Sequence, residues 1–115
     1  MTRPLAYITG DFWAKEYVAE VEAADYCKTV FDAGYNPICP ILFQNYFLDT
    51  TIPEIYAASR EMSLDMLRRS RIVIVCGPTR PDETLADIAL AKRLRIPVVT
   101  LEGILKLDKA TPKRK

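Results

Sequence analysis

The sequence predicts an α/β domain built on a parallel sheet of four or five strands, four of them in the order 2-1-3-4. Strand-like and helix-like segments alternate along the chain, which favours parallel strands joined by right-handed crossovers, with helices on both faces of the sheet. Residues 71–76 are almost wholly apolar and mostly β-branched, as in a central strand that is covered on both sides. Pro37 marks a sheet edge, because proline cannot donate to a ladder.

The first part of the chain contains two predicted strands separated by a helix. Residues 5–9 are apolar and β-prone, and a glycine-aspartate pair ends the run, so we expect a buried strand there. From 13 to 33, apolar side chains recur every three or four positions, which predicts a helix. Gly34 follows where a C-terminal glycine belongs, and residues 36–39 form the second predicted strand.

The middle of the chain is predicted to cover one end of the sheet and then form a long helix. Residues 40–50 are rich in aromatic side chains without a clean period, which indicates a loop or a short helix. Thr51 and Glu54 have the spacing of a capping box, with threonine as the N-cap. The helix that they open is expected to run to about Arg69.

The second half of the chain repeats the strand-helix pattern. Residues 71–76 form the third predicted strand, and the Gly-Pro pair at 77–78 breaks it. Residues 79–82 look like another capping arrangement, which opens a helix to Leu94. Residues 96–101 then form the fourth predicted strand.

Length and charge indicate one domain with a basic end. The chain has 115 residues, which are too few for two ordinary domains. We therefore expect a single domain over residues 1–107, which ends with a short helix over 104–107. Residues 108–115 are predicted to be a basic disordered tail. Residues 106–115 carry five basic side chains against one acidic, so the remaining body has a net charge of −3. This balance argues against a nucleic-acid-binding surface, which needs clustered basic residues.

The composition also excludes several kinds of site. The chain has no histidine, so neither a Ser-His-Asp or Cys-His nucleophilic site nor an imidazole zinc site can form. The cysteines are odd in number and contain no CxxC pair, which favours reduced packing residues over a metal cluster or disulfide framework. We therefore expect no metal and no cofactor. The three cysteines are Cys27, Cys39 and Cys76.

The location expected from the sequence is cytoplasmic. No run of 18 apolar residues occurs, so we expect no membrane-spanning helix. Residues 1–10 lack the basic start, apolar run and small-residue cleavage site of a secretory signal.

The predicted sheet order locates a binding site. Ligands of such sheets bind outside the carboxyl ends of the strands where the order reverses, here between the first and third strands. Residues 10–13, the 40–50 segment and residues 77–87 meet at that point. The chain has neither a GxGxxG fingerprint nor a P-loop, and two acidic residues at 82–83 disfavour a phosphate at the following helix. The predicted ligand-binding residues are Gly10, Asp11, Phe12, Trp13, Phe43, Gly77 and Arg80.

Asp87 is the most informative candidate at this site. It lies on one helical stripe with Leu90, Ala91 and Leu94, so its carboxylate is expected to face the sheet. A carboxylate in that position needs a partner or a function. Two interpretations stay open: a structural group bonded to Tyr7, a loop amide or an arginine, or a reactive group.

Several segments form a pattern that a known family shares. They are Tyr7 to Gly10, the loop at Pro40, the helix end at Leu64 and Leu67, and Gly77 through Leu94, with the clearest likeness over 87–99. In this order they resemble the nucleoside 2-deoxyribosyltransferase superfamily, over residues 4–101. The resemblance implies a flavodoxin-like three-layer sandwich.

The resemblance also implies roles for individual residues. Members of that family cleave the N-glycosidic bond of a deoxynucleoside with a glutamate that attacks the sugar carbon, and Asp87 falls at that position. Tyr7 would position it, and Asp65 or Glu61 would protonate the leaving base, since the family's acid position carries Ser63. Three other residues also differ from those that the family carries at the corresponding positions: Pro81, Glu83 and Arg71.

The resulting expectation is a protein that binds a nucleoside or nucleotide at the strand ends, with weak or absent N-glycosidic transfer. An active transferase working through Asp87 and a catalytically silent binding protein both remain open. A third alternative is an interaction module that uses Phe43, Tyr46 and Phe47. The resemblance further implies a homodimer or a larger homo-oligomer.

Overall fold

The computed structural model describes residues 2–15 and 19–110 and confirms the predicted α/β architecture. Its four strands form one sheet in the order β2-β1-β3-β4, and every neighbouring pair is parallel. The strand at the edge beside β1 contains Pro37, as expected. The strands are β1 (Leu5–Gly10), β2 (Asn36–Ile38), β3 (Ile72–Cys76) and β4 (Val98–Thr100).

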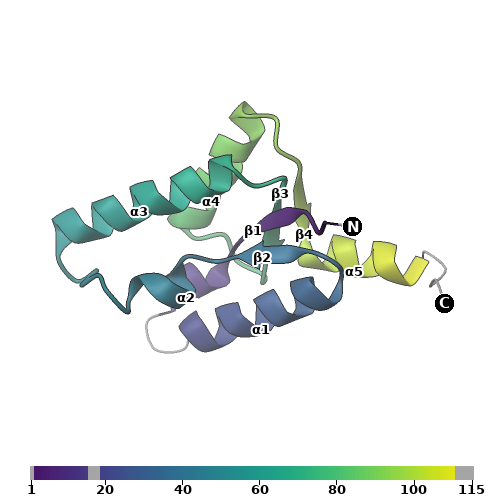
Figure 1. The fold of residues 1–115 in the computed structure, drawn as a ribbon, viewed down its shortest axis with the longest axis horizontal. Helices are drawn as coiled ribbons and strands as arrows, with labels where there is room; N and C mark the ends of the chain where they lie inside the picture. The colour runs from purple at the N-terminus through teal and green to yellow at the C-terminus, as the bar shows by residue number, and fades with distance from the viewer. Residues whose placement is uncertain (1, 16–18, 111–115) are drawn as a thin grey trace.

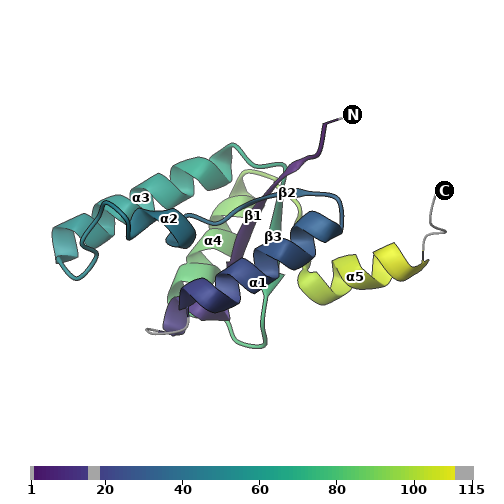
Figure 2. The same ribbon diagram turned by 60° about the horizontal axis from the view of Figure 1, so that its bottom comes forward.

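Helices cover both faces of the sheet, so the fold is a flavodoxin-like three-layer sandwich (Figure 1). On one face, α1 and α5 pack on Ile8 and Ile74. On the other face, α3 and α4 pack on Tyr7 and Val73, and Figure 2 shows α1 in front of the sheet with α3 and α4 behind it. The helical elements are η1 (Asp11–Ala14, a 3-10 turn), α1 (Ala19–Asp32), α2 (Ile41–Gln44), α3 (Pro53–Arg68), α4 (Asp82–Arg93) and α5 (Leu101–Ala110).

The residue pattern of β1 explains this arrangement. Successive side chains of a strand point to opposite faces, so Ala6 and Ile8 join the core under α1 and α5. Tyr7 and Thr9 point the other way, toward α3 and α4.

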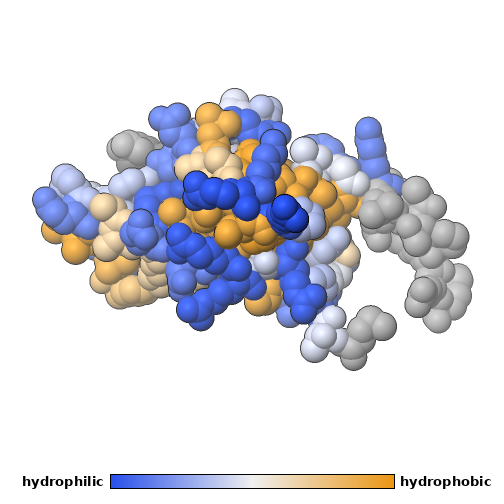
Figure 3. Space-filling model, turned by 90° about the horizontal axis from the view of Figure 1, so that it is seen from above, coloured by the Kyte–Doolittle hydropathy of each residue, from blue (hydrophilic) through white to orange (hydrophobic). Residues whose placement is uncertain are grey.

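Viewed from above, hydrophobic side chains gather in the middle of the molecular surface, between hydrophilic ones (Figure 3).

Both predicted helix caps are wrong. Helix α3 begins at Pro53 after Ile52, without a side-chain cap, because Thr51 donates its backbone N–H (3.1 Å) and its hydroxyl to Asp49 Oδ1. Helix α4 begins after Pro81, which has no capping group. The expected capping bond is therefore missing at α3 because Asp49 is a competing local acceptor for Thr51. It is missing at α4 because the N-cap residue is a proline.

Two other boundaries also differ from the expectation. The predicted helix from 13 to 33 is instead the short turn η1 followed by α1, and residues 16–18 lie outside the described part of the chain. Near the C-terminus, the predicted strand over 96–101 ends at Thr100, and the helix predicted over 104–107 starts already at Leu101. Helix α5 begins there because the Thr100 hydroxyl accepts a hydrogen bond from the Gly103 N–H at 3.0 Å.

The predicted tail begins within a helix. Helix α5 continues to Ala110, so the first three residues of the 108–115 segment are helical, and residues 111–115 lie outside the described part of the chain. Among the helices within residues 2–15 and 19–110, none combines the length and the apolar character needed to cross a membrane.

Candidate functional site

A buried carboxylate lies at the carboxyl end of β1. Helix α4 presents Asp87 toward the sheet, as its helical stripe predicts, and the side chain is fully buried. One carboxylate oxygen accepts a hydrogen bond from the Thr9 hydroxyl at 2.7 Å. The other accepts one from Arg60 on α3, with Nη2 at 2.9 Å. Both oxygens of Asp87 are therefore bonded to the protein itself.

The partners of Asp87 are held by a wider network. The indole Nε1 of Trp13 donates to the Thr9 hydroxyl at 3.2 Å, and the Arg60 guanidinium lies over the Trp13 ring, with Cζ 4.8 Å from its centroid. One turn before Asp87, the Thr84 hydroxyl donates to the Gly10 carbonyl at 3.0 Å. These contacts connect β1, η1, α3 and α4 around one carboxylate, and a connected polar network of this kind rigidifies its members.

Burial dominates the electrostatics of this network. It raises the pKa of Asp87, while the Arg60 charge and the Thr9 hydroxyl act in the opposite direction. Burial, and next the Asp87 charge, raise the pKa of Tyr7 far above its ordinary value. The Tyr7 hydroxyl is buried beside Ser63, yet it makes no hydrogen bond of normal geometry within the described residues. It remains protonated at neutral pH.

A cleft of about 690 Å³ opens next to this network. Phe12 and Trp13 of η1 form one part of its wall, and Tyr56 and Ser59 of α3 form another. Gln44, at the end of α2, also lines it, as do two charged residues, Lys15 and Glu20. The lining thus combines aromatic rings with amide and hydroxyl groups, which is the usual composition of a small-molecule site.

Hydrogen bonds hold the polar side chains of the cleft. The Gln44 amide donates to the Ser59 carbonyl at 2.9 Å and to the Ser63 hydroxyl at 3.2 Å. The Tyr56 hydroxyl donates to the Glu83 carboxylate, and partial burial raises the pKa of Tyr56 to about 12. The cleft is therefore bounded by groups that are already oriented.

The predicted ligand-binding residues are distributed over several places. Phe12 and Trp13 line the cleft, whereas Gly10, Asp11 and Gly77 do not. The Asp11 carboxylate is 3% exposed, accepts a hydrogen bond from Tyr26 at 3.1 Å and packs against Gly77. These contacts bury Asp11, and its 3.6 Å ion pair with Lys15 connects it to the wall of the cleft.

Two further predicted residues lie elsewhere. Phe43 lines a second pocket beside β2, because α2 turns its ring toward Ile38 and Met66. Arg80 is exposed and donates to the Gly77 carbonyl at 2.7 Å. Local packing directs the Phe43 ring, and a backbone carbonyl directs the Arg80 side chain. Neither cause can be recognised from a sequence pattern.

The expected acids on α3 face away from the site. Ser63 and Leu67 are fully buried and define the face of α3 that packs on the sheet. Glu61 and Asp65 lie on its outer face, where the half-exposed Asp65 carboxylate pairs with Arg69 at 3.2 Å. The shifted register that would bring either acid to Asp87 is therefore wrong.

Arg60 and Thr9, the two partners of Asp87, were not among the expected site residues. The partners expected for Asp87 include an arginine, but the sequence pattern does not give its position. Arg60 is separated from Ser63 and Leu67 by three and seven positions, the spacing of one helix face, so helical periodicity could have identified it.

Comparison with known proteins gives a family but no activity. Residues 4–101 match the model of a family described as a domain of unknown function, DUF7768. No curated protein matches the chain. The matched segment spans all four strands and every residue of the Asp87 network.

Proposed function

We propose that this chain, which belongs to the DUF7768 family of domains of unknown function, binds a nucleoside or nucleotide in the cleft beside Asp87 and cleaves its N-glycosidic bond weakly or not at all. The observation that carries the proposal is the state of Asp87. Its side chain is fully buried and both oxygens are bonded, while a cleft with aromatic walls lies next to it.

The composition of the cleft supports a ligand with a heteroaromatic ring. Trp13 and Phe12 contribute rings on which a nucleobase can stack, and such stacking is tolerant of the base. Asn45 is exposed beside the rings, and although its Nδ2 donates to Glu20 at 3.0 Å, it keeps a second N–H that can meet the polar edge of a base. The cleft lies beyond the carboxyl end of β1, lined by η1 and by residues that follow β2, whereas none of its lining residues comes from β3 or from the 77–87 segment that was expected to contribute. Ligands of parallel sheets bind at the carboxyl ends of the strands.

The surroundings of Asp87 argue against a nucleophilic role. A nucleophile needs a free carboxylate oxygen that reaches the substrate, whereas Thr9 and Arg60 bond both oxygens of Asp87. The family that the sequence resembles uses a glutamate there, and an aspartate places its carboxylate roughly 1 Å or more away, which can cost on the order of a hundredfold in rate.

The position that the resemblance assigns to a general acid argues in the same direction. Ser63 is fully buried, donates its hydroxyl proton to the Ser59 carbonyl at 3.0 Å and accepts from Gln44. A serine hydroxyl in that arrangement does not protonate a leaving base at neutral pH. Loss of a general acid typically costs about 10²–10⁴-fold in rate.

Replacing Trp13 with leucine tests the binding proposal. We expect calorimetric titration with deoxynucleosides and their 5′-monophosphates to identify at least one ligand, and the Trp13→Leu variant to bind it roughly tenfold more weakly, because a stacked base loses about 1–3 kcal/mol with its aromatic partner. Tyr46→Leu is the matched control, because Tyr46 is 85% exposed and lies outside the cleft. Equal weakening by both changes, or no binding to the wild type at millimolar concentration, contradicts the proposal.

Two exposed aromatic side chains favour a second candidate function, a contact between copies of the chain. Tyr46 and Phe47, between α2 and α3, are 85% and 62% exposed. Adjacent exposed rings on a small domain are typical of a surface that becomes buried in an assembly.

The oligomeric state tests this second candidate. We expect the wild type to self-associate in size-exclusion chromatography with light scattering, and the double change Tyr46→Ser and Phe47→Ser to yield a monomer, because it removes the apolar contact. Arg68→Ser, an exposed change on α3, serves as the control. A wild type that is monomeric at every concentration rules out the contact.

A further inference from the structure

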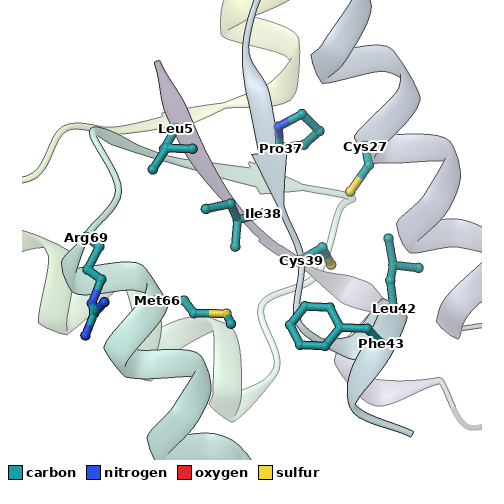
Figure 4. Close-up of a pocket in the computed structure, with 9 residues that line it drawn as sticks. All are labelled: Leu5, Cys27, Pro37, Ile38, Cys39, Leu42, Phe43, Met66 and Arg69. Carbon is teal, nitrogen blue, oxygen red and sulfur yellow. The ribbon is translucent and has the colours of Figure 1, made fainter. Parts of the chain in front are cut away.

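A second pocket, of about 640 Å³, contains two of the three free thiols of the chain. It lies beside the edge strand β2, and its lining is mostly apolar. Cys27 reaches it from α1, and Cys39 reaches it from the residue that follows β2 (Figure 4). Two cysteines 12 positions apart in the sequence are thus brought into one pocket by the packing of α1 on the sheet.

The two thiols are interacting and unequal. Cys27 is partly exposed, whereas Cys39 is only 5% exposed. The neighbouring Cys39 thiol lowers the pKa of Cys27 below its ordinary value. The same interaction, together with burial, raises the pKa of Cys39. The accessible thiol is therefore also the one that ionises more readily, which is the condition for reaction with an oxidant.

We propose that Cys27 and Cys39 form a redox modification site, in which Cys27 reacts with hydrogen peroxide and Cys39 resolves the product to an intramolecular disulfide. In the first step the Cys27 thiolate attacks one peroxide oxygen and the O–O bond breaks, giving a Cys27 sulfenic acid and hydroxide, which takes up a proton to become water. In the second step the Cys39 sulfur attacks the Cys27 sulfur, and the S–O bond breaks. The hydroxyl group leaves with the Cys39 proton as a second water, so two thiols are oxidised and one peroxide is reduced.

The third cysteine provides an internal reference. Cys76 is fully buried at the end of β3, where burial raises its pKa to about 12. A thiol without solvent access and with so little thiolate does not react at the surface.

The disulfide between Cys27 and Cys39 would join α1 to the start of α2, and α2 carries Ile41 and Gln44 to the wall of the cleft.

Thiol counting on the native protein tests the proposal. After treatment with hydrogen peroxide and denaturation, we expect the number of free thiols to fall from three to one and the mass of the monomer to fall by two hydrogen atoms. Trypsin places Cys27 and Cys39 in separate peptides, 16–28 and 29–60, so the expected product is a single linked pair of these peptides that dithiothreitol separates.

Single cysteine substitutions show which thiol reacts with peroxide and which one resolves the product. We expect Cys76→Ser to form the same link, and Cys27→Ser to retain its two remaining thiols. In Cys39→Ser, or Cys39→Ala if the serine variant does not fold, Cys27 should accumulate as a sulfenic acid that dimedone traps. Three free thiols after treatment of the wild type, a link that includes Cys76, or links only between chains overturns the proposal.

Discussion

Replacing Asp87 with alanine is expected to lower the free energy of unfolding by about 3 kcal/mol, since removing one member of a buried ion pair leaves the other uncompensated. The Arg60 side chain is 14% exposed, so its charge cannot regain full hydration when the Asp87 carboxylate is lost. The Thr9 hydroxyl loses its 2.7 Å acceptor at the same time. Urea unfolding followed by circular dichroism measures the change.

A surface pair at the end of α3, the helix that carries Arg60, supplies the control for Asp87. Asp65→Ala removes the exposed pair with Arg69, and we expect a change of about 0.5 kcal/mol or less. A double-mutant cycle between Asp87→Ala and Arg60→Ala should yield a coupling energy above about 1 kcal/mol. Equal stability of Asp87→Ala and wild type would mean that the buried pair does not form in solution.

Replacing Gly10 with alanine is expected to destabilise the fold by about 3 kcal/mol, through overlap with the backbone of the neighbouring strand. Gly10 pairs with Cys76 in the β1–β3 ladder, and a Cβ at residue 10 would lie 2.2 Å from the Cys76 carbonyl oxygen. That oxygen belongs to the main chain and cannot turn aside, so the strands must separate. The change would also move the Gly10 carbonyl, which accepts the Thr84 hydrogen bond.

Gly34 provides a matched control for this substitution. A Cβ there meets no atom within 4 Å, although Gly34 has a φ of +106°. We expect Gly34→Ala to cost only about 1 kcal/mol, from backbone conformation alone. Denaturant midpoints of the two variants separate the causes, and a Gly10→Ala variant no less stable than Gly34→Ala contradicts the close approach of β1 and β3.

The fold could be predicted because its signals are local or follow from chain connectivity. The alternation of strand and helix implies parallel pairing, and the apolar run at Ile72–Cys76 and the proline at position 37 give the strand order. Helix caps were less predictable, since Thr51 has a competing acceptor in Asp49 two residues away. Sequence spacing alone does not decide between such alternatives.

The site could be predicted only in part. The helical stripe of α4 correctly turns Asp87 inward, but the partner arginine lies 27 residues away on another helix. Its meeting with Asp87 depends on how α3 and α4 pack on the sheet. The cleft likewise forms where η1, α2 and α3 converge, which explains why Gln44 and Tyr56 were not among the expected residues.

The central claim is that the cleft holds a nucleoside-like ligand and cleaves it weakly or not at all. The most direct measurement is a series of amide NMR spectra of the labelled protein with each added deoxynucleoside or deoxynucleotide, in which the sugar protons of the ligand are followed in the same samples. We expect shifts concentrated at residues that line the cleft, such as Trp13, Gln44 and Tyr56, together with unchanged sugar signals over hours. Absence of shifts for every ligand, or rapid release of free base, at roughly one turnover per second, that disappears in the Asp87→Ala variant, would contradict the claim.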